Sequence, residues 1–293
     1  MISYTPLDYR SRTKPVWCAG CGDYGVLAAL YKALSVMKLN PKDVVIVSGI
    51  GCSSRLPDFV KAYGFHGAHG RALPVAIGIK ASNPSLTVFV AGGDGDGLSI
   101  GAGHLPHAAR KNVDITYILM DNAIYGMTKG QCSPTSELDF ESGSSPYGTI
   151  EEPLDPIALS LIYGSTFVAR GYSGSSKIDQ LIDLIIKAVE HKGFSFIQVL
   201  SPCVTYNKVV TFQSLNAQVV DIEKEHDITD RNKALALALS ACVSPHADRD
   251  EKKLYVGLFY RADKPTFNER LAVMSEKCGK GSLDIERLYA KFT

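Results

Sequence analysis

The chain has 293 residues, a formal net charge of +1, and a composition that is 45% hydrophobic and 21% charged. This length allows one large α/β domain with an extension, and a nearly balanced charge without a basic stripe argues against a nucleic-acid partner. No apolar run approaches the ~18 residues that a membrane span needs, and the N-terminus lacks the apolar core of a signal peptide. We therefore expect a cytoplasmic globular protein with no membrane partner.

Helix-like and strand-like segments alternate along the first two-thirds of the chain. Apolar residues at helical spacing predict helices over residues 22–37, 73–81, 97–111 and 176–191. Apolar runs rich in β-branched residues predict strands over residues 44–50, 86–91, 114–120, 163–170 and 194–200. This alternation is typical of an α/β fold with a doubly wound, mostly parallel sheet.

The pattern divides the chain into two parts. Residues 1–205 form the predicted α/β domain, within which the polar segment 131–156 is long enough to be a functional loop. Residues 206–293 lack the alternation and contain one predicted helix over 231–241. We expect this second part to be a C-terminal extension that packs on the core or on a partner.

Four glycines and two carboxylates follow the predicted strand at 86–91, in the stretch Gly92 to Gly97 (GGDGDG). Glycines let a backbone approach an anion closely, whereas a carboxylate there would repel a bare phosphate unless a metal ion bridged them. Asn122 follows the next predicted strand, so Asp94 and Asn122 come from neighbouring loops. Their oxygens suit Mg²⁺ or Ca²⁺ bound to a diphosphate. Alternatively, Asp94 caps the next helix and Asn122 forms an Asx-turn.

Four of the seven cysteines are predicted to lie at one edge of the sheet. Cys52 and Cys203 each follow a predicted strand, at the carboxyl edge where open α/β sheets bind ligands. Cys18 and Cys21 precede a helix that must return the chain to the opposite edge, so they belong at the carboxyl edge too. Four thiols can hold zinc or an iron–sulfur cluster, and their spacing alone leaves both open. The other cysteines are expected to be free or packing thiols: Cys132, Cys242 and Cys278.

Several stretches together resemble one family. The sequence GDG followed at this interval by Asn resembles the thiamine diphosphate motif of enzymes that use that cofactor. The wider text from Gly92 to Ser136 resembles the β subunit of 2-oxoacid:ferredoxin oxidoreductases. So do three further stretches: WCAGCGDYG (17–25), SGIGCSSRLP (48–57) and HGRALPVAIGIKASNP (69–84). The resemblance covers roughly residues 10–205.

This resemblance implies roles for individual residues. Asp94, Asn122 and the backbone oxygen of Ile124 would hold Mg²⁺ against the diphosphate. The remaining contacts with thiamine diphosphate would come from Ile50, Gly51, Cys52, Ser53, His69, Gly95, Asp96, Gly126 and Met127. The ligands of a [4Fe-4S] cluster would be Cys18, Cys21, Cys52 and Cys203.

Two cations near these residues are candidates for binding a substrate carboxylate. Arg55 lies three residues after Cys52, and Lys129 lies seven residues after Asn122. Either cation could pair with the carboxylate, or it could form a solvated or structural ion pair. The family commonly carries Lys where Arg55 stands and often Leu at Met127, so the substrate range can differ here.

The activity implied by the resemblance is oxidative decarboxylation of a 2-oxoacid, such as pyruvate or 2-oxoglutarate, with coenzyme A. Acyl-CoA and CO₂ would be the products, and electrons would pass one at a time through the cluster to ferredoxin. Thiamine enzymes also need a glutamate on the aminopyrimidine from a second domain, so we expect a heterodimer with a larger α subunit. The alternatives are an indolepyruvate-type oxidoreductase, half of a non-oxidative decarboxylase, or a non-catalytic zinc module.

Overall fold

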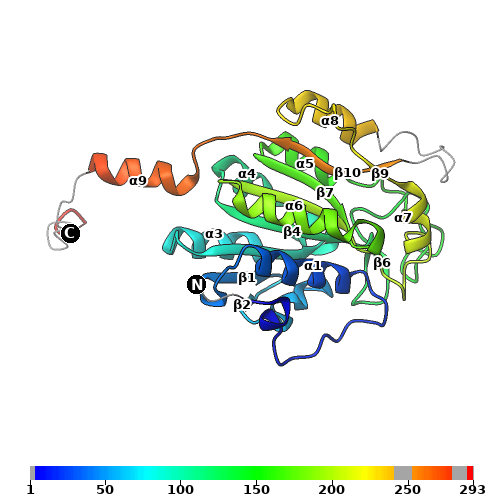
Figure 1. Ribbon diagram of the computed structural model, residues 1–293. Helices are drawn as coiled ribbons and strands as arrows, with labels where there is room; N and C mark the ends of the chain where they lie inside the picture. Colours follow the sequence, from blue (N-terminus) through cyan, green and yellow to red (C-terminus); the bar gives the residue numbers. More distant parts are fainter. Residues whose placement is uncertain (1–3, 241–252, 279–288, 293) are drawn as a thin grey trace.

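Eight strands form one mostly parallel sheet in the order β2-β1-β3-β4-β8-β7-β10-β9, with helices on both faces (Figure 1). The computed structural model describes residues 4–240, 253–278 and 289–292. Among the described strands of this sheet, β10 runs antiparallel to its neighbour β7, and β9 is parallel to β10. The strands are β1 (Val44–Ser48), β2 (Tyr63–His66), β3 (Thr87–Gly93), β4 (Ile115–Asp121), β7 (Phe167–Tyr172), β8 (Phe194–Leu200), β9 (Val219–Asp221) and β10 (Leu254–Arg261). A separate two-stranded ribbon pairs β5 (Ile124–Tyr125) with β6 (Gln131–Cys132).

The helices cover the two faces of the sheet and extend beyond it at the C-terminal end. They are α1 (Asp23–Val36), α2 (Leu56–Phe59), α3 (Ala72–Ser82), α4 (Leu105–Lys111), α5 (Pro156–Tyr163), α6 (Ile178–Glu190), α7 (Phe212–Gln218), α8 (Arg231–Ser240) and α9 (Phe267–Cys278). Figure 1 shows α1 and α6 on the near face and α9 projecting away from the body. No helix in the described ranges is both long and apolar enough to cross a membrane.

The alternation along β1 shows why the sheet is buried on both faces. Val44 and Ile46 pack into the core under α1 and α6, whereas Val45 and Val47 pack into the core under α3, α4, α5 and α8. All five residues of the strand are buried. Strands covered on both sides are apolar at every position, which confirms the prediction of a doubly wound sheet.

Residues after 206 add to this same sheet. β10 pairs with β7, and Ala234 and Ala238 of α8 are buried in the core on that face. In its described residues, the extension therefore packs on the core through β10 and α8, and also through Leu215 of α7, which is buried with Tyr172 and Leu200. The division of the chain near residue 205 stays a prediction.

The prediction of one continuous helix over residues 97–111 is wrong. A wide turn spans Asp96–Ile100, a 3₁₀ turn spans Ala102–His104, and the α-helix begins only at Leu105. Ser99 has φ −97° and ψ −106°, outside the helical region. Glycines at 101 and 103 weaken the helix at the break, because glycine loses more conformational freedom in a helix than any other residue.

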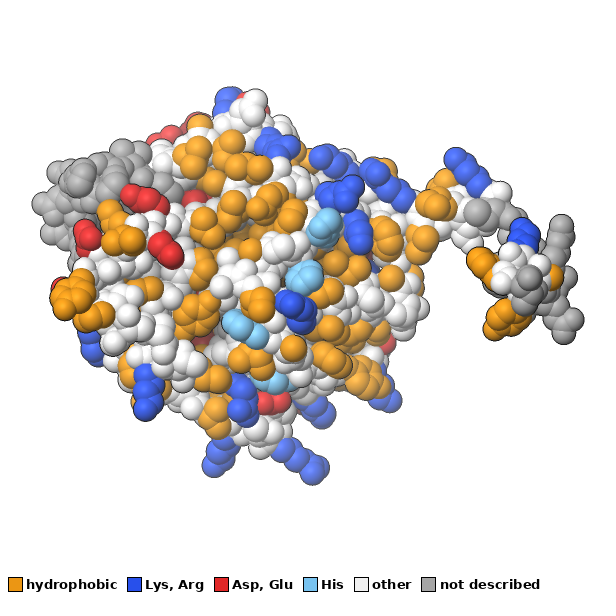
Figure 2. All heavy atoms as spheres, turned by 180° about the vertical axis from the view of Figure 1, so that it is seen from behind, with side chains coloured by type: hydrophobic (Ala, Val, Ile, Leu, Met, Phe, Trp, Pro, Cys, Tyr) orange, Lys and Arg blue, Asp and Glu red, His pale blue; other side chains and the backbone are white. Residues whose placement is uncertain are grey.

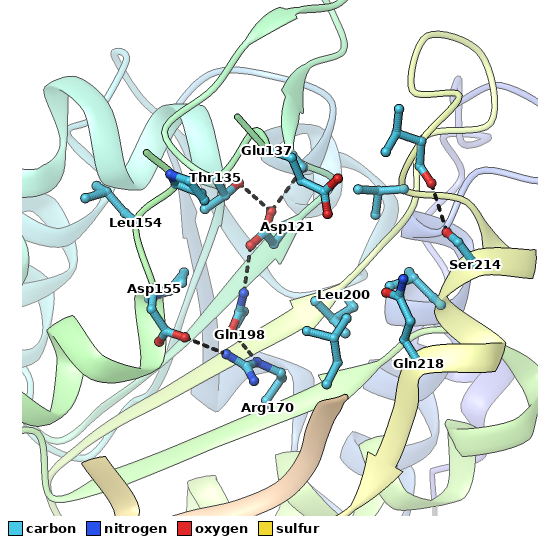
Figure 3. Close-up of a pocket in the computed structure, with 17 residues that line it drawn as sticks. Asp121, Thr135, Glu137, Leu154, Asp155, Arg170, Gln198, Leu200, Ser214 and Gln218 are labelled. Atoms are coloured by element: carbon cyan, nitrogen blue, oxygen red, sulfur yellow. Dashed lines mark hydrogen bonds and ion pairs between the residues drawn. The ribbon is translucent and has the colours of Figure 1, made fainter. Parts of the chain in front are cut away.

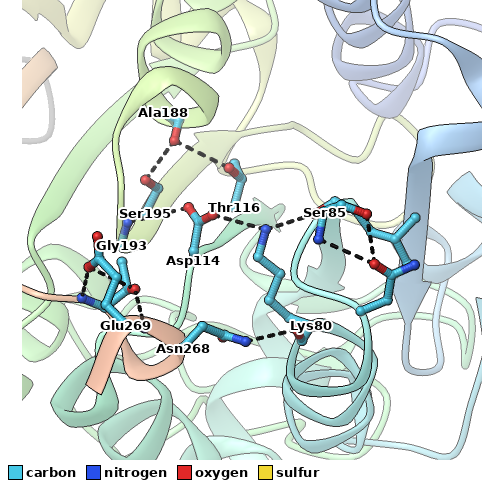
Figure 4. Close-up of polar contacts among 12 residues, drawn as sticks. Lys80, Ser85, Asp114, Thr116, Ala188, Gly193, Ser195, Asn268 and Glu269 are labelled. Carbon is cyan, nitrogen blue, oxygen red and sulfur yellow. Dashed lines mark hydrogen bonds and ion pairs between the residues drawn. The ribbon is translucent and has the colours of Figure 1, made fainter. Parts of the chain in front are cut away.

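An ion pair between Lys80 and Asp114 joins α3 to the start of β4 at the amino edge of the sheet (Figure 4). Lys80 of α3 lies 2.9 Å from the carboxylate of Asp114, just before β4, and donates to the carbonyl of Leu86 at 2.7 Å. Asn268, in α9, donates to the carbonyl of Lys80 at 3.2 Å. These contacts attach the start of α9 to the edge opposite the predicted site.

Candidate functional site

The predicted ligands meet at the carboxyl edge of the sheet. The loops after β1, β3, β4 and β8 carry Cys52, Asp94, Asn122 and Cys203, and the segment before α1 joins them there. The backbone N–H of Gly22, next to Cys21, donates to the carbonyl of Pro202 at 3.1 Å. The N–H of Ser201 donates to the carbonyl of Asp121 at 2.7 Å. The predicted placement at one edge is confirmed.

Asp94 shares a hydroxyl group with a second buried carboxylate. Thr135 Oγ1 lies 2.9 Å from Asp94 Oδ2 and 2.8 Å from Asp121 Oδ1. Burial raises the pKa of Asp94, and the charge of Asp121 raises it further; burial also raises the pKa of Asp121. A divalent cation beside Asp94 would offset this repulsion, so the acidic pair fits Mg²⁺. The alternative that Asp94 caps the following turn is not seen, since its carboxylate accepts from the loop carrying Thr135 and from Asn122 N–H.

A chain of hydrogen bonds through Gln198 and Arg170 holds Asp121 in position (Figure 3). Its Oδ2 accepts from Gln198 at 2.7 Å, and Gln198 in turn accepts from Arg170 Nε at 2.7 Å. Arg170 also pairs with Asp155 at 3.1 Å. This chain borders a cavity of about 240 Å³ whose other walls are mainly apolar and include Leu154, Leu200 and Leu215. Asp94 Oδ1 accepts a long hydrogen bond, from Asn122 N–H at 3.4 Å, whereas the two oxygens of Asp121 lie 2.8 and 2.7 Å from their donors, so Asp94 is the better placed of the two carboxylates to bind a cation.

Asn122 forms the turn that follows β4. Its Oδ1 accepts from Ile124 N–H at 3.0 Å, which is the Asx-turn considered as the alternative for this residue. Its own carbonyl accepts from Asn207 at 3.0 Å, so a residue of the extension holds the turn. Asn122 N–H donates to Asp94 Oδ1 at 3.4 Å, so the turn lies beside Asp94, and its amide and carbonyl oxygens are hard ligands of the kind that suits Mg²⁺.

The carboxylate of Asp96 joins the loops around the site through hydrogen bonds. Its Oδ1 accepts from Ile50 N–H at 2.9 Å and from Gly70 N–H at 2.7 Å, and it lies 2.8 Å from His69 Nδ1. A side chain at Gly49 would collide with the Asp96 carboxylate. Asp96 therefore positions Ile50 and His69, two of the predicted cofactor contacts.

The four predicted cluster ligands line one cavity of about 210 Å³: Cys18, Cys21, Cys52 and Cys203. Burial raises the pKa of the Cys52 thiol to about 11 and also raises that of Cys21, so without a metal these groups keep their protons. Within the described residues, no three Cys, His, Asp or Glu side chains are arranged to hold a single metal ion. Four thiols around one cavity supply the ligand set that a [4Fe-4S] cluster takes.

Gly126 and Asn122 both line this cavity beside the thiols. A Cβ added at Gly126 would lie 3.7 Å from Cys203 Sγ and 3.8 Å from Cys52 Sγ. It would lie 3.6 Å from Asn122 Nδ2. The predicted cluster ligands and the predicted magnesium ligand thus face the same glycine.

The remaining predicted residues lie around this centre. Met127 and Ile50 are partly exposed, and a side chain at Gly95 would collide with the ring of Tyr125. Ser53 is buried beside Gly93, and Gly51 has a positive φ of 123° that favours glycine. Cys132 is not among the residues that line the cysteine cavity; its thiol lies 3.7 Å from the carbonyl of Phe140, and it packs against the apolar cluster of Ile124, Phe140 and Cys203. Cys242 and the side chain of Cys278 lie outside the described residues.

The two candidate substrate cations are placed differently. Arg55 lines the cysteine cavity, and its Nε lies 2.9 Å from Asp58. Lys129 is exposed, with a φ of 81°, in the loop beyond Gly126. Arg55 is therefore an ion-paired side chain beside the site, and Lys129 is a solvent-facing one.

Several residues of the site were missed by reasoning from the sequence. Thr135, Gln198 and Arg170 hold the acidic pair, and Asp23 lies buried near the thiols, where it accepts from Ser201 at 2.6 Å. Burial raises the pKa of Asp23 to about 6. Asp121, the second buried carboxylate, was missed as well. Its position directly before Asn122 is the one feature of the sequence that pointed to it.

Two family models match the chain. Residues 49–199 match the thiamine pyrophosphate enzyme C-terminal TPP binding domain, and residues 203–276 match the C-terminal part of the pyruvate ferredoxin oxidoreductase beta subunit. The 2-oxoacid:ferredoxin oxidoreductase subunit beta of Saccharolobus solfataricus is 42% identical over 265 residues, which cover 88% of this chain and 86% of that protein. The 2-oxoglutarate synthase subunit KorB of Methanothermobacter marburgensis is 39% identical over 272 residues, which cover 92% of each.

A solved structure matches over the whole chain. It is a 2-oxoglutarate:ferredoxin oxidoreductase from Magnetococcus marinus with 2-oxoglutarate, coenzyme A and succinyl-CoA bound. It is 41% identical with a TM-score of 0.92, and the match covers 100% of this chain and 97% of that one. Fold, site and relatives agree: the chain belongs to the family of 2-oxoacid:ferredoxin oxidoreductase β subunits.

Proposed function

We propose that this chain, with a larger α subunit, catalyses CoA-dependent oxidative decarboxylation of a 2-oxoacid and passes the electrons singly to ferredoxin. The observation that carries the proposal is the convergence on Gly126. A Cβ added at this glycine would lie within 3.8 Å of Asn122 Nδ2 and of the thiols of Cys52 and Cys203. A site for a diphosphate cofactor and a site for a one-electron carrier are thereby brought side by side, as a redox decarboxylation needs.

The chain's own residues would bind the cofactors as follows. Asp94, Asn122 and the carbonyl of Ile124 would hold Mg²⁺, while Cys18, Cys21, Cys52 and Cys203 would hold the cluster. The hydrogen bonds of Asp96 hold Ile50 and His69 in place beside these ligands. When bound, thiamine diphosphate supplies the electron sink for the bond that breaks as CO₂ leaves.

Substrate binding would use the side chains at the mouth of the site. Nε of Arg55 is paired with Asp58, which leaves the terminal nitrogens of the guanidinium for a substrate carboxylate. Met127 and Ile50 would cover the reacting carbon and exclude water. Relatives named as 2-oxoglutarate enzymes make 2-oxoglutarate a substrate to test beside pyruvate.

The partner would be a larger α subunit that supplies the pyrimidine-binding domain and its glutamate. One face of the molecule displays many hydrophobic side chains interspersed with histidines, which suits burial against another protein (Figure 2). Tyr63 and Phe65 of the edge strand β2 are exposed to 60% and 47%. The cytoplasmic location stays a prediction.

The test is to assay the chain alone and after coexpression with its α subunit under anaerobic conditions. We expect the complex to reduce a viologen dye in the presence of CoA and either pyruvate or 2-oxoglutarate, and the chain alone to be inactive. Activity of the single chain would contradict the need for the α subunit. A complex inactive with every 2-oxoacid would contradict the proposed reaction.

A further inference from the structure

A basic segment with a fixed backbone lies next to the cysteine cavity. Arg10, Arg12 and Lys14 are exposed and line a second surface cavity of about 390 Å³. The segment is anchored because Ser11 N–H donates to the carbonyl of Phe59 at 3.0 Å, and Ser11 Oγ donates to that of Asp58 at 2.6 Å. These cations therefore project from an ordered surface rather than from a loose terminus.

The charges of this segment are not neutralised locally. In the part of the chain that the structure describes, none of Arg10, Arg12 and Lys14 forms an ion pair. The nearby carboxylate of Asp58 is paired with Arg55 instead. The whole chain has a net charge of only +1, so the basic cavity is a local excess. Lys and Arg side chains protrude along the lower edge in Figure 2, the edge along which the N-terminal segment runs in Figure 1.

Two hydrogen-bonded residues, Tyr24 and Trp17, lie between the basic cavity and the cysteines. Tyr24 lines the basic cavity, and its hydroxyl donates to the carbonyl of Trp17 at 3.2 Å. Trp17 lines the cysteine cavity, and its indole N–H donates to the carbonyl of Cys52 at 2.7 Å. Cys18, the next residue, is exposed, whereas Cys203 is buried. The cysteine site is thus accessible from solvent at Cys18, which is four residues after Lys14 in the chain.

We propose that Arg10, Arg12 and Lys14 form the docking surface for the acidic face of the one-electron acceptor protein. This inference rests on the proposed function and adds where the acceptor binds. Each docking event would move one electron, which reduces the acceptor by one and oxidises the donor by one, with no bond or proton changed at this surface. Two acceptor molecules would be consumed for each 2-oxoacid.

Electrostatics explain why this arrangement favours transfer. Electron transfer slows steeply with distance, so the acceptor must approach the exposed Cys18 side. A cluster of like charges raises the association rate of an oppositely charged partner by roughly 10- to 1,000-fold, and salt screens the effect. Charges at the rim of such an interface act mainly on the association rate and its salt dependence.

The test compares the wild-type α–β complex with an R12E/K14E double variant. With a purified acidic bacterial ferredoxin at low salt, we expect the variant to have a KM for ferredoxin raised by about tenfold or more and a much weaker salt dependence. Its rate with a viologen dye, which needs no protein docking, should stay within about twofold of wild type. Binding of oxidised ferredoxin, measured by biolayer interferometry without turnover, should weaken in parallel.

A matched control reverses two lysines at the opposite edge. Lys42 precedes β1 and Lys192 precedes β8, so both lie at the amino edge of the sheet, and both are exposed. The K42E/K192E variant should keep the wild-type KM and binding constant for ferredoxin. Equal losses in the two variants would overturn the proposal, because total charge alone would then explain the effect.

Two further outcomes would also overturn it. Unchanged ferredoxin binding in R12E/K14E would exclude docking at this surface. A raised KM for coenzyme A with unchanged ferredoxin kinetics would assign the cavity to the phosphates of that molecule. If the wild-type complex turns over no 2-oxoacid, the proposed function fails, while the binding measurement still decides where ferredoxin docks.

Discussion

Asp94 and Asp121, from the ends of neighbouring strands, both lie within hydrogen-bonding distance of the Thr135 hydroxyl, at 2.9 and 2.8 Å. One hydroxyl carries one hydrogen, so it donates to only one carboxylate at a time. A divalent cation close by would offset the charge of the two carboxylates, because both groups are buried. A long polar loop of the chain thereby supports the predicted magnesium ligand.

Replacing Thr135 with Val should weaken cofactor binding. The substitution keeps the shape of the side chain but removes the shared donor, and losing a hydrogen bond to a charged group costs about 1.5–3 kcal/mol, or roughly 10- to 100-fold in affinity. Titration calorimetry of Mg²⁺ with thiamine diphosphate on the α–β complex measures this. T135S keeps the hydroxyl and should bind nearly as wild type. Equal affinity in T135V and wild type would show that the bridge does not position Asp94.

The cysteine assignment predicts a difference in iron content among variants. C52S and C203S should each lower the iron content and the broad visible absorbance of the anaerobically purified complex, because each loses a cluster ligand. C132S should keep both, since its thiol faces the carbonyl of Phe140 rather than the cavity. A colourless wild-type protein containing zinc would contradict the cluster.

Arg55 and Lys129 should differ in their effect on substrate binding. R55A should raise the KM for pyruvate and 2-oxoglutarate by roughly tenfold or more, the cost of losing a charge-assisted hydrogen bond. R55K keeps a cation and should recover much of the loss. We expect K129A to have a smaller effect, because this exposed side chain lies in water. Unchanged KM values in R55A would exclude its proposed role.

His191 should make the stability of the protein depend on pH. Its Nε2 lies 2.8 Å from Thr166 Oγ1, which itself donates to Asn112, so Nε2 carries the hydrogen. Its Nδ1 is buried with no hydrogen-bond partner among the described residues, which fits the neutral ring. Burial, together with the charge of Arg261, lowers the pKa of His191 to about 4. The unfolded chain binds this proton near pH 6.5, well before the folded chain does. Stability should therefore fall as pH decreases from about 6.5 to 4, by roughly 1–3 kcal/mol from this group.

The measurement is the midpoint of thermal unfolding between pH 4 and pH 7, for wild type and H191Q. The variant has no proton to take up at this position, so its midpoint should fall less steeply over this range. H191Q should also keep a donor toward Thr166, which separates the pH effect from a general loss of stability. Parallel curves would show that other groups cause the acid sensitivity.

Reasoning from the sequence located most elements that carry the site, and failed where local patterns conflict with packing. The helix at 23–36 and the strands at 44–48, 87–93, 115–121 and 194–200 were predicted within a few residues, because strong apolar periodicity marked them. The helix over 97–111 was wrong, since its glycines permit a broken path. The short edge strand β2 was missed, because all four of its residues are exposed.

The sequence by itself determined which loops carry the chemistry: Asp94, Asn122 and the cysteines follow buried strands or precede a helix, and parallel strands send such loops to one edge. The tertiary structure decided which groups touch. The order β3-β4-β8-β7 sets Gln198 of β8 between Asp121 of β4 and Arg170 of β7, and folding brings Thr135 over Asp94. Such contacts join residues far apart in the chain, and local periodicity does not encode strand order or the path of a long polar loop.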